Sequence, residues 1–200
     1  MEADTQETGL RERKRQETFE RIAEASLRLF VEQGYEHTTL EQIAEAAGIS
    51  RRTFFYYFKA KDDVLVGLQC DGFVRALEQV FDGVDPSEAP FDVVARRMPA
   101  LAASFETPET RLITGIMKST DALRVRKQAG YVEMETALLE ALARTWPDPA
   151  MRARLAMVAT ATISVLRLSL DEWYAAGAAR PIGDYLNEAF ELLRQSIGGR

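Results

Sequence analysis

The sequence predicts an all-α protein, and three observations point to this fold class. Strong helix formers such as Ala, Leu, Glu and Arg dominate the 200 residues. Apolar residues recur at helical spacing in most segments. Few stretches combine the β-branched and aromatic residues that favour strands. We therefore expect an N-terminal module of three helices followed by a larger C-terminal helical domain.

Composition excludes several classes of function. With 46% hydrophobic and 28% charged residues, the chain has the composition of an ordinary soluble globular protein. A formal net charge of -6 argues against indiscriminate coating of nucleic acid, but it leaves room for a local basic surface. Cys70 is the single cysteine, so no intramolecular disulfide is possible. His37 is the single histidine, and we expect neither a metal site nor a cofactor.

No N-terminal signal peptide is recognisable, because the first residues are polar and lack an apolar core. The longest apolar stretch, from Leu155 to Leu170, is interrupted by Arg167 and looks too short to span a bilayer. The expected location is the cytoplasm, without a membrane partner.

The N-terminal third contains the clearest local pattern. Residues 1–10 are polar and predict a disordered tail. A helix to about Gln33 follows, and Gly34 ends it as a C-terminal cap. Its apolar face consists of Ile22, Ala25, Leu29 and Phe30.

A helix-turn-helix follows this first helix. Thr39 and Gln42 have the spacing of a capping box, so the second helix starts at Thr39. Gly48 makes the turn, because a left-handed backbone is cheap only for glycine. Ser50 caps a third helix to about Tyr57. Phe54 and the residue four positions later, Phe58, should face inward.

Turn signals divide the remainder into further helices. The segment 82–90, rich in Asp, Pro, Gly and Ser, predicts a linker. The apolar periodicity predicts helices at about 61–81, 91–105, 108–117, 121–146, 149–176 and 182–197.

A helix-turn-helix can press its second helix into the major groove of DNA. The residues on this helix that face away from the core are the candidates for base edges: Arg51, Arg52, Thr53 and Tyr56. The candidates for phosphate contact lie at the flanks: Thr38, Thr39, Tyr57, Lys59 and Lys61. Arg11 to Arg15 could form a basic arm on DNA, or simply a solubilising start of the helix. For Arg51, a base contact and an ordinary solvated or phosphate-facing position stay equally open.

Residues 11–66 resemble the tetracycline-repressor (TetR) family of bacterial regulators. The resemblance is carried by Ile22, Ala25, Leu29, Phe30, Gly34-Tyr35, Thr38-Thr39, Ile43-Ala44, the run Ala47-Gly48-Ile49-Ser50, Thr53, Phe58, Lys61 and Leu65. It implies a transcriptional repressor that binds a palindromic operator as a homodimer. The family usually has a tyrosine at the position of Phe55, whose hydroxyl touches phosphate. Phe55 cannot make that hydrogen bond, but it can contact a sugar or a base methyl group.

This resemblance divides the chain into three expected parts. These are a disordered N-terminal tail (1–10), a helix-turn-helix DNA-binding domain (11–60) and a helical effector-binding and dimerisation domain (61–200). The last two helices should form the dimer interface, because the helix at about 149–176 is apolar nearly all round. A monomeric core is the alternative.

An apolar effector pocket is expected within the C-terminal domain. Its candidate lining is Met98, Leu101, Phe105, Leu112, Ile116, Met117, Tyr131, Met134 and Arg167. Each apolar residue among them can equally be ordinary core. Arg167 stands within an apolar helix and needs a partner, either Asp171 one turn on or an anionic ligand.

The sequence thus predicts a DNA-binding transcriptional regulator released by a small apolar or amphipathic effector. The alternative is an architectural DNA-binding protein without an effector. An enzyme is not expected, because no nucleophile–base pair, glycine-rich phosphate loop or metal cluster is recognisable.

Overall fold

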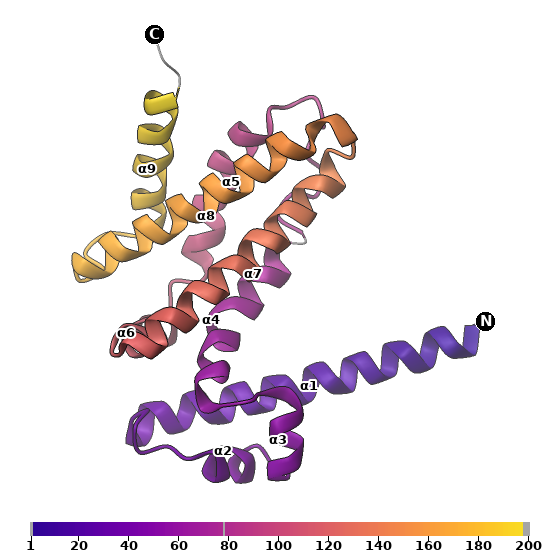
Figure 1. Cartoon of the computed structure of the whole chain (residues 1–200), viewed down its shortest axis with the longest axis vertical. Coiled ribbons are helices and arrows are strands. Elements are labelled where there is room, and N and C mark those ends of the chain that lie inside the picture. Colours follow the sequence, from indigo (N-terminus) through magenta and orange to yellow (C-terminus); the bar gives the residue numbers. More distant parts are fainter. Residues whose placement is uncertain (1, 78, 198–200) are drawn as a thin grey trace. The chain divides into compact units, whose positions relative to one another are not determined.

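The computed structural model describes residues 2–77 and 79–197, without the side chains of residues 2–12, 69 and 197. The chain is 79% helical, and its described residues contain no strand. In chain order the helices are α1 (Glu2–Gln33), α2 (Leu40–Ala46), α3 (Arg51–Tyr57), α4 (Lys61–Leu77), α5 (Pro90–Ser104), α6 (Pro108–Lys118), α7 (Asp121–Thr145), α8 (Arg152–Ala175) and α9 (Ile182–Ile197) (Figure 1). A 3-10 turn, Pro149–Met151, precedes α8.

The helices form two compact units. The first comprises Met1–Leu68 with Ile116–Arg126, and the second comprises Gln69–Gly115 with Lys127–Arg200. Helices α4, α6 and α7 each contribute residues to both units.

The first unit is organised by the local signals predicted from the sequence. The Thr39 hydroxyl accepts a hydrogen bond from the backbone of Gln42, whose side chain accepts one from the Thr39 backbone, so the capping box is confirmed. Gly34 and Gly48 both have positive φ, 83° and 65°, as their predicted turns require. Phe54 is fully buried, which confirms its inward position on α3.

Two boundaries differ from the sequence prediction. Helix α1 begins at Glu2, so its first turns lie within residues 1–10, the segment for which the sequence predicted a tail. Helix α4 ends at Leu77 rather than near Phe81, and turns follow it. The Trp146 indole donates to the carbonyl of Pro86 at 2.9 Å and holds the linker before α5.

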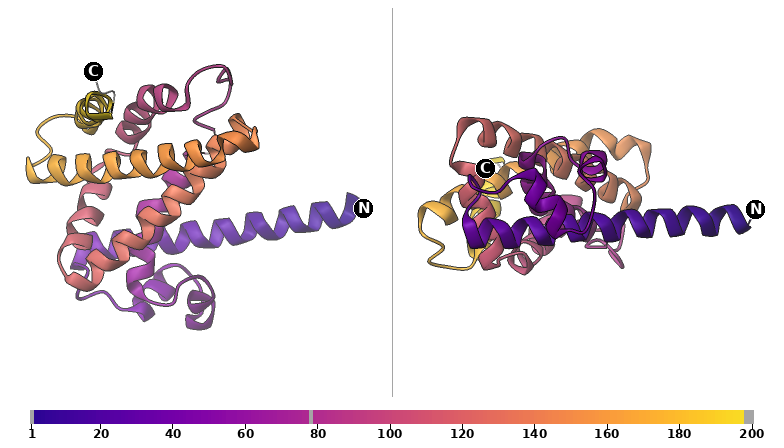
Figure 2. Two further views of the ribbon diagram at one scale, coloured as in Figure 1. Left: turned by 45° about the horizontal axis from the view of Figure 1, so that its top comes forward. Right: turned by 90° about the horizontal axis from the view of Figure 1, so that it is seen from below.

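In the second unit, α5, α8 and α9 pack against one another (Figure 2). Gly183 lets α9 approach α5 closely, because a Cβ at this position would lie 3.2 Å from the carbonyl oxygen of Pro99. The Trp173 indole on α8 donates to the carbonyl of Arg180 at 2.9 Å. This bond fixes the turn between α8 and α9.

One helical segment, Pro149–Ala175, is apolar and long enough to cross a membrane by length and composition alone. It contains the apolar stretch from Leu155 to Leu170 that the sequence analysis considered. In the structure 44% of the segment's apolar window is buried against other helices, as in the core helix of a globular protein.

The capping box at α2 gives a stability prediction. Thr39→Ala should lower the free energy of unfolding by about 0.5–2 kcal/mol, because it leaves a backbone N–H of the first turn without its acceptor. Urea unfolding followed by circular dichroism measures the change. Thr39→Ser keeps the hydroxyl and should stay close to the wild type. Equal destabilisation by both substitutions would contradict the capping role.

Candidate nucleic-acid interface and effector site

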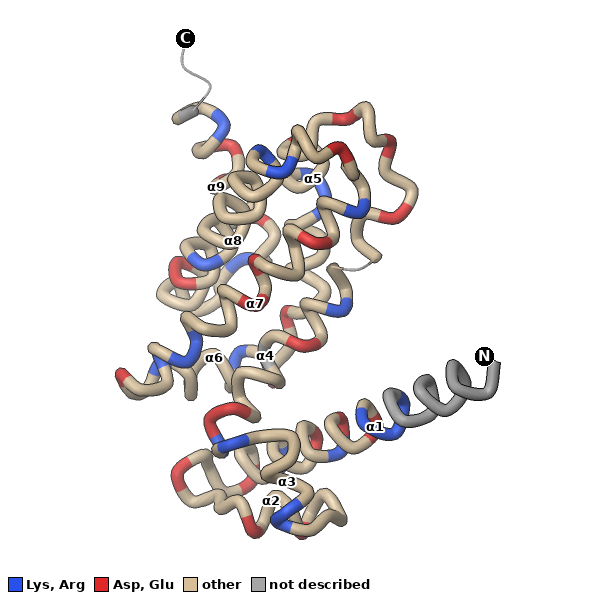
Figure 3. Tube along the Cα trace, turned by 45° about the vertical axis from the view of Figure 1, so that its right-hand side comes forward, with Lys and Arg blue, Asp and Glu red and all other residues tan. Residues whose placement is uncertain are grey.

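Helix α3 presents one face to solvent and buries the other. Arg51 and Arg52 at its start are exposed, as are Phe55 and Tyr56, with 42% and 75% of their surfaces accessible. Figure 3 marks the basic start of this helix in blue. The buried Phe54 anchors the opposite face. Four of the predicted contact residues therefore share one accessible surface.

The remaining α3 candidates are half-buried. The Thr53 hydroxyl lies 2.9 Å from that of Ser50, and the Thr53 backbone donates to the same oxygen. This cap ties Thr53 to the helix start. The ring of Tyr57 lies 5.3 Å from that of Tyr56, edge to face, at the boundary of the exposed surface.

Arg51 is held loosely in the absence of DNA. Its guanidinium lies 2.9 Å from the carboxylate of Glu41 and 5.5 Å from the centre of the Phe55 ring. Both charged side chains are more than half exposed. An exposed ion pair of this kind contributes about 0–1 kcal/mol, so a phosphate or a guanine edge can replace Glu41 at little cost.

The two threonines before α2 differ in accessibility. Thr39 is exposed at the helix N-terminus, where a phosphate can approach. Thr38 is only 2% exposed, and its hydroxyl donates to the carbonyl of Gly34 at 2.8 Å. The hydroxyl of Thr38 therefore holds the loop between α1 and α2 and is covered from solvent.

Lys61, predicted as a phosphate contact, is engaged within the protein. Its ammonium donates to the carbonyls of Tyr35 at 2.6 Å and Thr38 at 3.0 Å, and it lies 4.0 Å from the centre of the Tyr35 ring. Lys59, by contrast, is exposed, and its backbone N–H donates to the Asp63 carboxylate at 3.0 Å.

Two side chains from elsewhere in the unit, Tyr35 and Arg126, bind the carboxylates at the start of α4. The Tyr35 phenol donates to Asp62, and burial together with this hydrogen bond raises the pKa of Tyr35 well above its usual value. Arg126, on the first turns of α7, pairs with Asp62 at 3.2 Å and also binds Asp63. Sequence reasoning missed Arg126, because nothing local distinguishes it from a solvated arginine.

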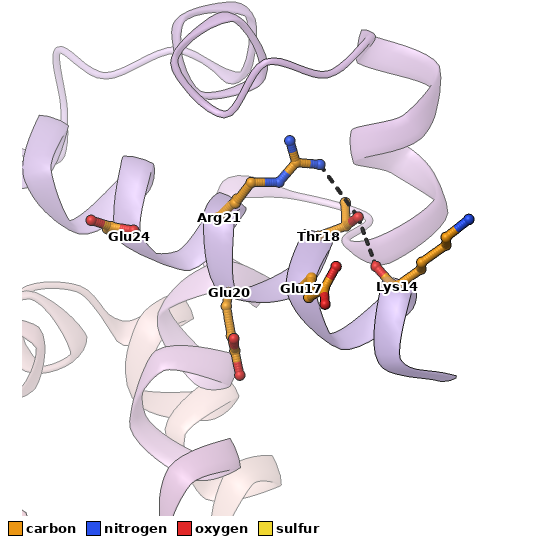
Figure 4. Close-up of a pocket in the computed structure, with 6 residues that line it drawn as sticks. All are labelled: Lys14, Glu17, Thr18, Glu20, Arg21 and Glu24. Atoms are coloured by element: carbon orange, nitrogen blue, oxygen red, sulfur yellow. Dashed lines mark hydrogen bonds between the residues drawn. The ribbon is translucent and has the colours of Figure 1, made fainter. Parts of the chain in front are cut away.

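The basic arm lies on α1. The side chain of Arg11 falls outside the described residues, and Arg15 is exposed. A shallow hollow on the same helix is lined by six polar side chains: Lys14, Glu17, Thr18, Glu20, Arg21 and Glu24 (Figure 4). The Thr18 hydroxyl donates to the Lys14 carbonyl at 2.9 Å. A lining of this kind does not suit an apolar effector.

The residues predicted to line an effector pocket fall in both units. Ile116 and Met117 belong to the first unit and the other seven to the second. Those buried in the second unit are Met98, Tyr131 and Met134. Those half-buried there are Leu101, Phe105, Leu112 and Arg167.

The charges near Arg167 are not paired as predicted. Asp171 lies 3.9 Å from the ammonium of Lys127 on α7, and no ion pair between Arg167 and Asp171 occurs among the described residues. Lys127 is only 6% exposed, whereas Arg167 is half-buried, so the lysine has the greater need of a counter-charge. Sequence reasoning missed Lys127, although it stands four residues before Tyr131 on one helix face.

Tyr131 and Cys70 complete this part of the second unit. The Tyr131 hydroxyl is buried and has no hydrogen-bond partner among the described residues. Burial, then the charge of Asp171, raises the pKa of its phenol above the usual range, so it stays protonated. Burial likewise raises the pKa of the Cys70 thiol to about 12. No group of three metal-ligating side chains occurs within the described part of the chain.

Comparison with known proteins identifies relatives of this arrangement. Residues 22–68 match the family model described as bacterial regulatory proteins, tetR family. The chain is 32% identical over 156 residues to the HTH-type transcriptional regulator TcmR of Streptomyces glaucescens, a match covering 76% of this chain and 63% of TcmR. It is 28% identical over 177 residues to the HTH-type transcriptional repressor AcnR of Corynebacterium diphtheriae, covering 88% and 89% of the two chains.

Solved structures share the fold. Thermus thermophilus FadR, a TetR-family repressor in complex with lauroyl-CoA, matches with a TM-score of 0.59 and 23% identity over 91% of this chain and 96% of FadR. A TetR-family regulator from Mesorhizobium loti has the same TM-score, with 16% identity over 90% of this chain and 96% of its own. The predicted all-α fold with an N-terminal helix-turn-helix is confirmed.

The two lysines at the α3–α4 junction give a matched prediction. Lys61→Met should lower the free energy of unfolding by about 1.5–3 kcal/mol, because two carbonyls lose a charged donor. Lys59→Met removes the same charge from an exposed side chain and should leave stability nearly unchanged. Urea unfolding compares the two variants. Coincident unfolding curves would exclude the internal role of Lys61.

Proposed function

Because this chain belongs to the TetR family of bacterial regulatory proteins, we propose that it is a repressor that binds a palindromic operator as a homodimer and leaves it on binding a small apolar or amphipathic effector. The family consists of non-enzymatic DNA-binding transcriptional regulators, which confirms that the chain is not an enzyme. A regulator of this kind works beside the chromosome, so we assign it to the cytoplasm.

The observation that carries the proposal is the exposed face of α3. Arg51 and Arg52 can each donate two hydrogen bonds to a guanine, and Tyr56 can contact a thymine methyl. Phe55 adds an apolar contact to sugar or base, and it cannot replace a phenol on phosphate. Thr53, half-buried beside Ser50, lies at the margin of this contact.

Phosphates are assigned to the residues that flank this face. These are Thr39 at the start of α2, Tyr57 and Lys59 at the end of α3, and Arg11 and Arg15 on α1. Thr38 and Lys61 act indirectly, since their polar atoms hold the loop that orients α2.

Dimerisation is assigned to α8 and α9. Met157 and Leu168 on α8 are 74% and 57% exposed, and Leu192 on α9 is 64% exposed. Half-buried Ala161 and Ser164 stand between the two α8 residues at spacings of four, three and four, which makes a continuous stripe along one helix face. Exposed apolar surface of this kind favours association with a second copy.

The effector is assigned to the second unit. The repressor FadR of Thermus thermophilus holds lauroyl-CoA, and that of Bacillus subtilis holds stearoyl-CoA, so the fold can accommodate long acyl groups. For this chain we propose release by a population shift: the effector binds more tightly to a conformer whose α3 helices are no longer one DNA turn apart. Arg126 on α7 pairs with Asp62 at the start of α4, and the next residue of α7, Lys127, belongs to the second unit.

Selection of duplexes from a random DNA pool at near-physiological salt tests the proposal. We expect a palindrome whose half-site centres lie about 34–36 Å apart. Arg52→Ala should weaken the preference for one base pair in each half-site. The free-energy difference between the preferred and the other base pairs should fall by about 1–3 kcal/mol. Arg96→Ala removes an exposed charge from α5 and should leave the selected sequence unchanged.

A selection that yields no common sequence motif would also be informative. If no motif emerges and binding disappears on adding salt, the contact is with phosphates alone. The protein would then be an architectural DNA-binding protein, and the repressor proposal would be withdrawn.

The dimer interface is tested by charge insertion. Light scattering during gel filtration should give the wild type twice the chain mass of 22.4 kDa. Leu168→Glu should give the monomer mass, because a carboxylate cannot be buried against the partner's apolar stripe. Val31→Glu alters a residue of α1 that is 62% exposed and serves as the control. A dimeric Leu168→Glu variant would exclude this face.

A further inference from the structure

The second unit contains a buried phenol whose hydroxyl lacks a partner. Tyr131 is 6% exposed, and its hydroxyl makes no hydrogen bond with a described residue. More than nine tenths of buried polar groups in native proteins are paired, and an unpaired one costs about 1–3 kcal/mol. Such a group calls for a partner that is supplied from outside the chain.

The face of α7 that carries Tyr131 is polar at one end and apolar at the other. Lys127, Tyr131, Met134 and Leu138 follow one another at spacings of four, three and four, and all four are buried. One end of this face therefore offers an ammonium and a phenol, and the other end offers only apolar surface. A molecule with a polar group and an apolar body matches this gradient.

The charges around Tyr131 come from α7 and α8. The Lys127 ammonium lies 5.6 Å from the centre of the Tyr131 ring and 3.9 Å from the carboxylate of Asp171. Arg167 lies close enough to lower the pKa of the phenol, against the opposing effects of burial, Asp171 and Cys70. Two cations and one carboxylate thus surround the phenol, which favours a ligand atom rich in electron density.

Further charged groups, on α4 and α7, act on Cys70 and its neighbour Asp71. After burial, Glu133 and Asp71 raise the pKa of the Cys70 thiol, and Arg75 lowers the pKa of Asp71 against burial and Glu133. Because the phenol stays protonated, its hydroxyl is available as a donor.

We propose that Tyr131, with Lys127 beside it, is the recognition point for a hydrogen-bond-accepting oxygen on an otherwise apolar effector. The oxygen is a carboxylate or a carbonyl group, and the apolar body lies along Met134 and Leu138. This inference rests on the proposed effector-regulated function, and it adds the chemical class of the effector and the residue that selects it.

Binding to five small probes without DNA tests the inference. Three share an unbranched chain: decanoate and methyl octyl ketone present an acceptor oxygen, whereas decylamine presents only donors. Fluorenone and fluorene form a matched ring pair with and without a carbonyl. Quenching of the two tryptophans reports binding. The wild type should bind the oxygen-bearing members about tenfold more tightly than their counterparts, as one buried hydrogen bond allows.

The decisive variant is Tyr131→Phe, which keeps the ring and removes the hydroxyl. It should lose the tenfold preference while its affinity for decylamine and fluorene stays the same. Its melting temperature without ligand should equal or exceed that of the wild type, because an unpaired buried hydroxyl is removed. Tyr185→Phe is the matched control: Tyr185 is equally buried, but its hydroxyl is bonded to Arg180, so the preference should survive.

The outcomes separate the sources of the oxygen. If decanoate binds most tightly, the effector oxygen is a carboxylate paired with Lys127. If methyl octyl ketone binds most tightly, it is a neutral carbonyl on a chain. If fluorenone binds most tightly, it is a ketone on a ring. A preference that persists in Tyr131→Phe, or wild-type protein that binds none of the probes, overturns the inference. Operator selection with ligand-free protein is a separate readout, so failure of the repressor proposal would be recognised independently.

Discussion

The ammonium of Lys61 is the constraint on which the geometry of the DNA-binding unit depends. It bridges the carbonyls of Tyr35 and Thr38, in the loop where α1 gives way to α2. The same loop is bonded to the start of α4 through the Tyr35 phenol and Asp62. The Thr38 hydroxyl also donates to the Gly34 carbonyl, so Lys61 and Thr38 together hold a loop that lacks helical hydrogen bonding. The direction of α2, and hence of the α3 surface, follows from this arrangement.

Sequence patterns predicted the features of this fold that depend on local chemistry. The cap at Thr39 and the left-handed turn at Gly48 each involve residues only a few positions apart in the chain. A short sequence motif is therefore enough to predict them. The burial of Thr38 and the engagement of Lys61 were missed, because a pattern indicates which face a residue occupies but not which distant group meets it. Arg126 was missed for the same reason: its partners lie more than sixty positions away.

Helix α7 combines two tasks on neighbouring residues. Arg126 forms ion pairs with the first turn of α4, and the Lys127 ammonium lies near the Tyr131 ring and the Asp171 carboxylate. Successive residues on a helix point about 100° apart, so one rigid rod can serve two different surroundings without a kink.

The lone thiol has a practical consequence. Cys70 is 2% exposed, and its pKa of about 12 keeps it in the unreactive protonated form. Oxidants and alkylating reagents should therefore find almost no thiolate on the folded chain, and dimers cross-linked by a disulfide are not expected. A cysteine introduced on the solvent face of α3 would be the one site open to a spectroscopic label. Distances between the two recognition helices of a dimer could then be measured in solution, with and without effector, on a chain that keeps every other native residue.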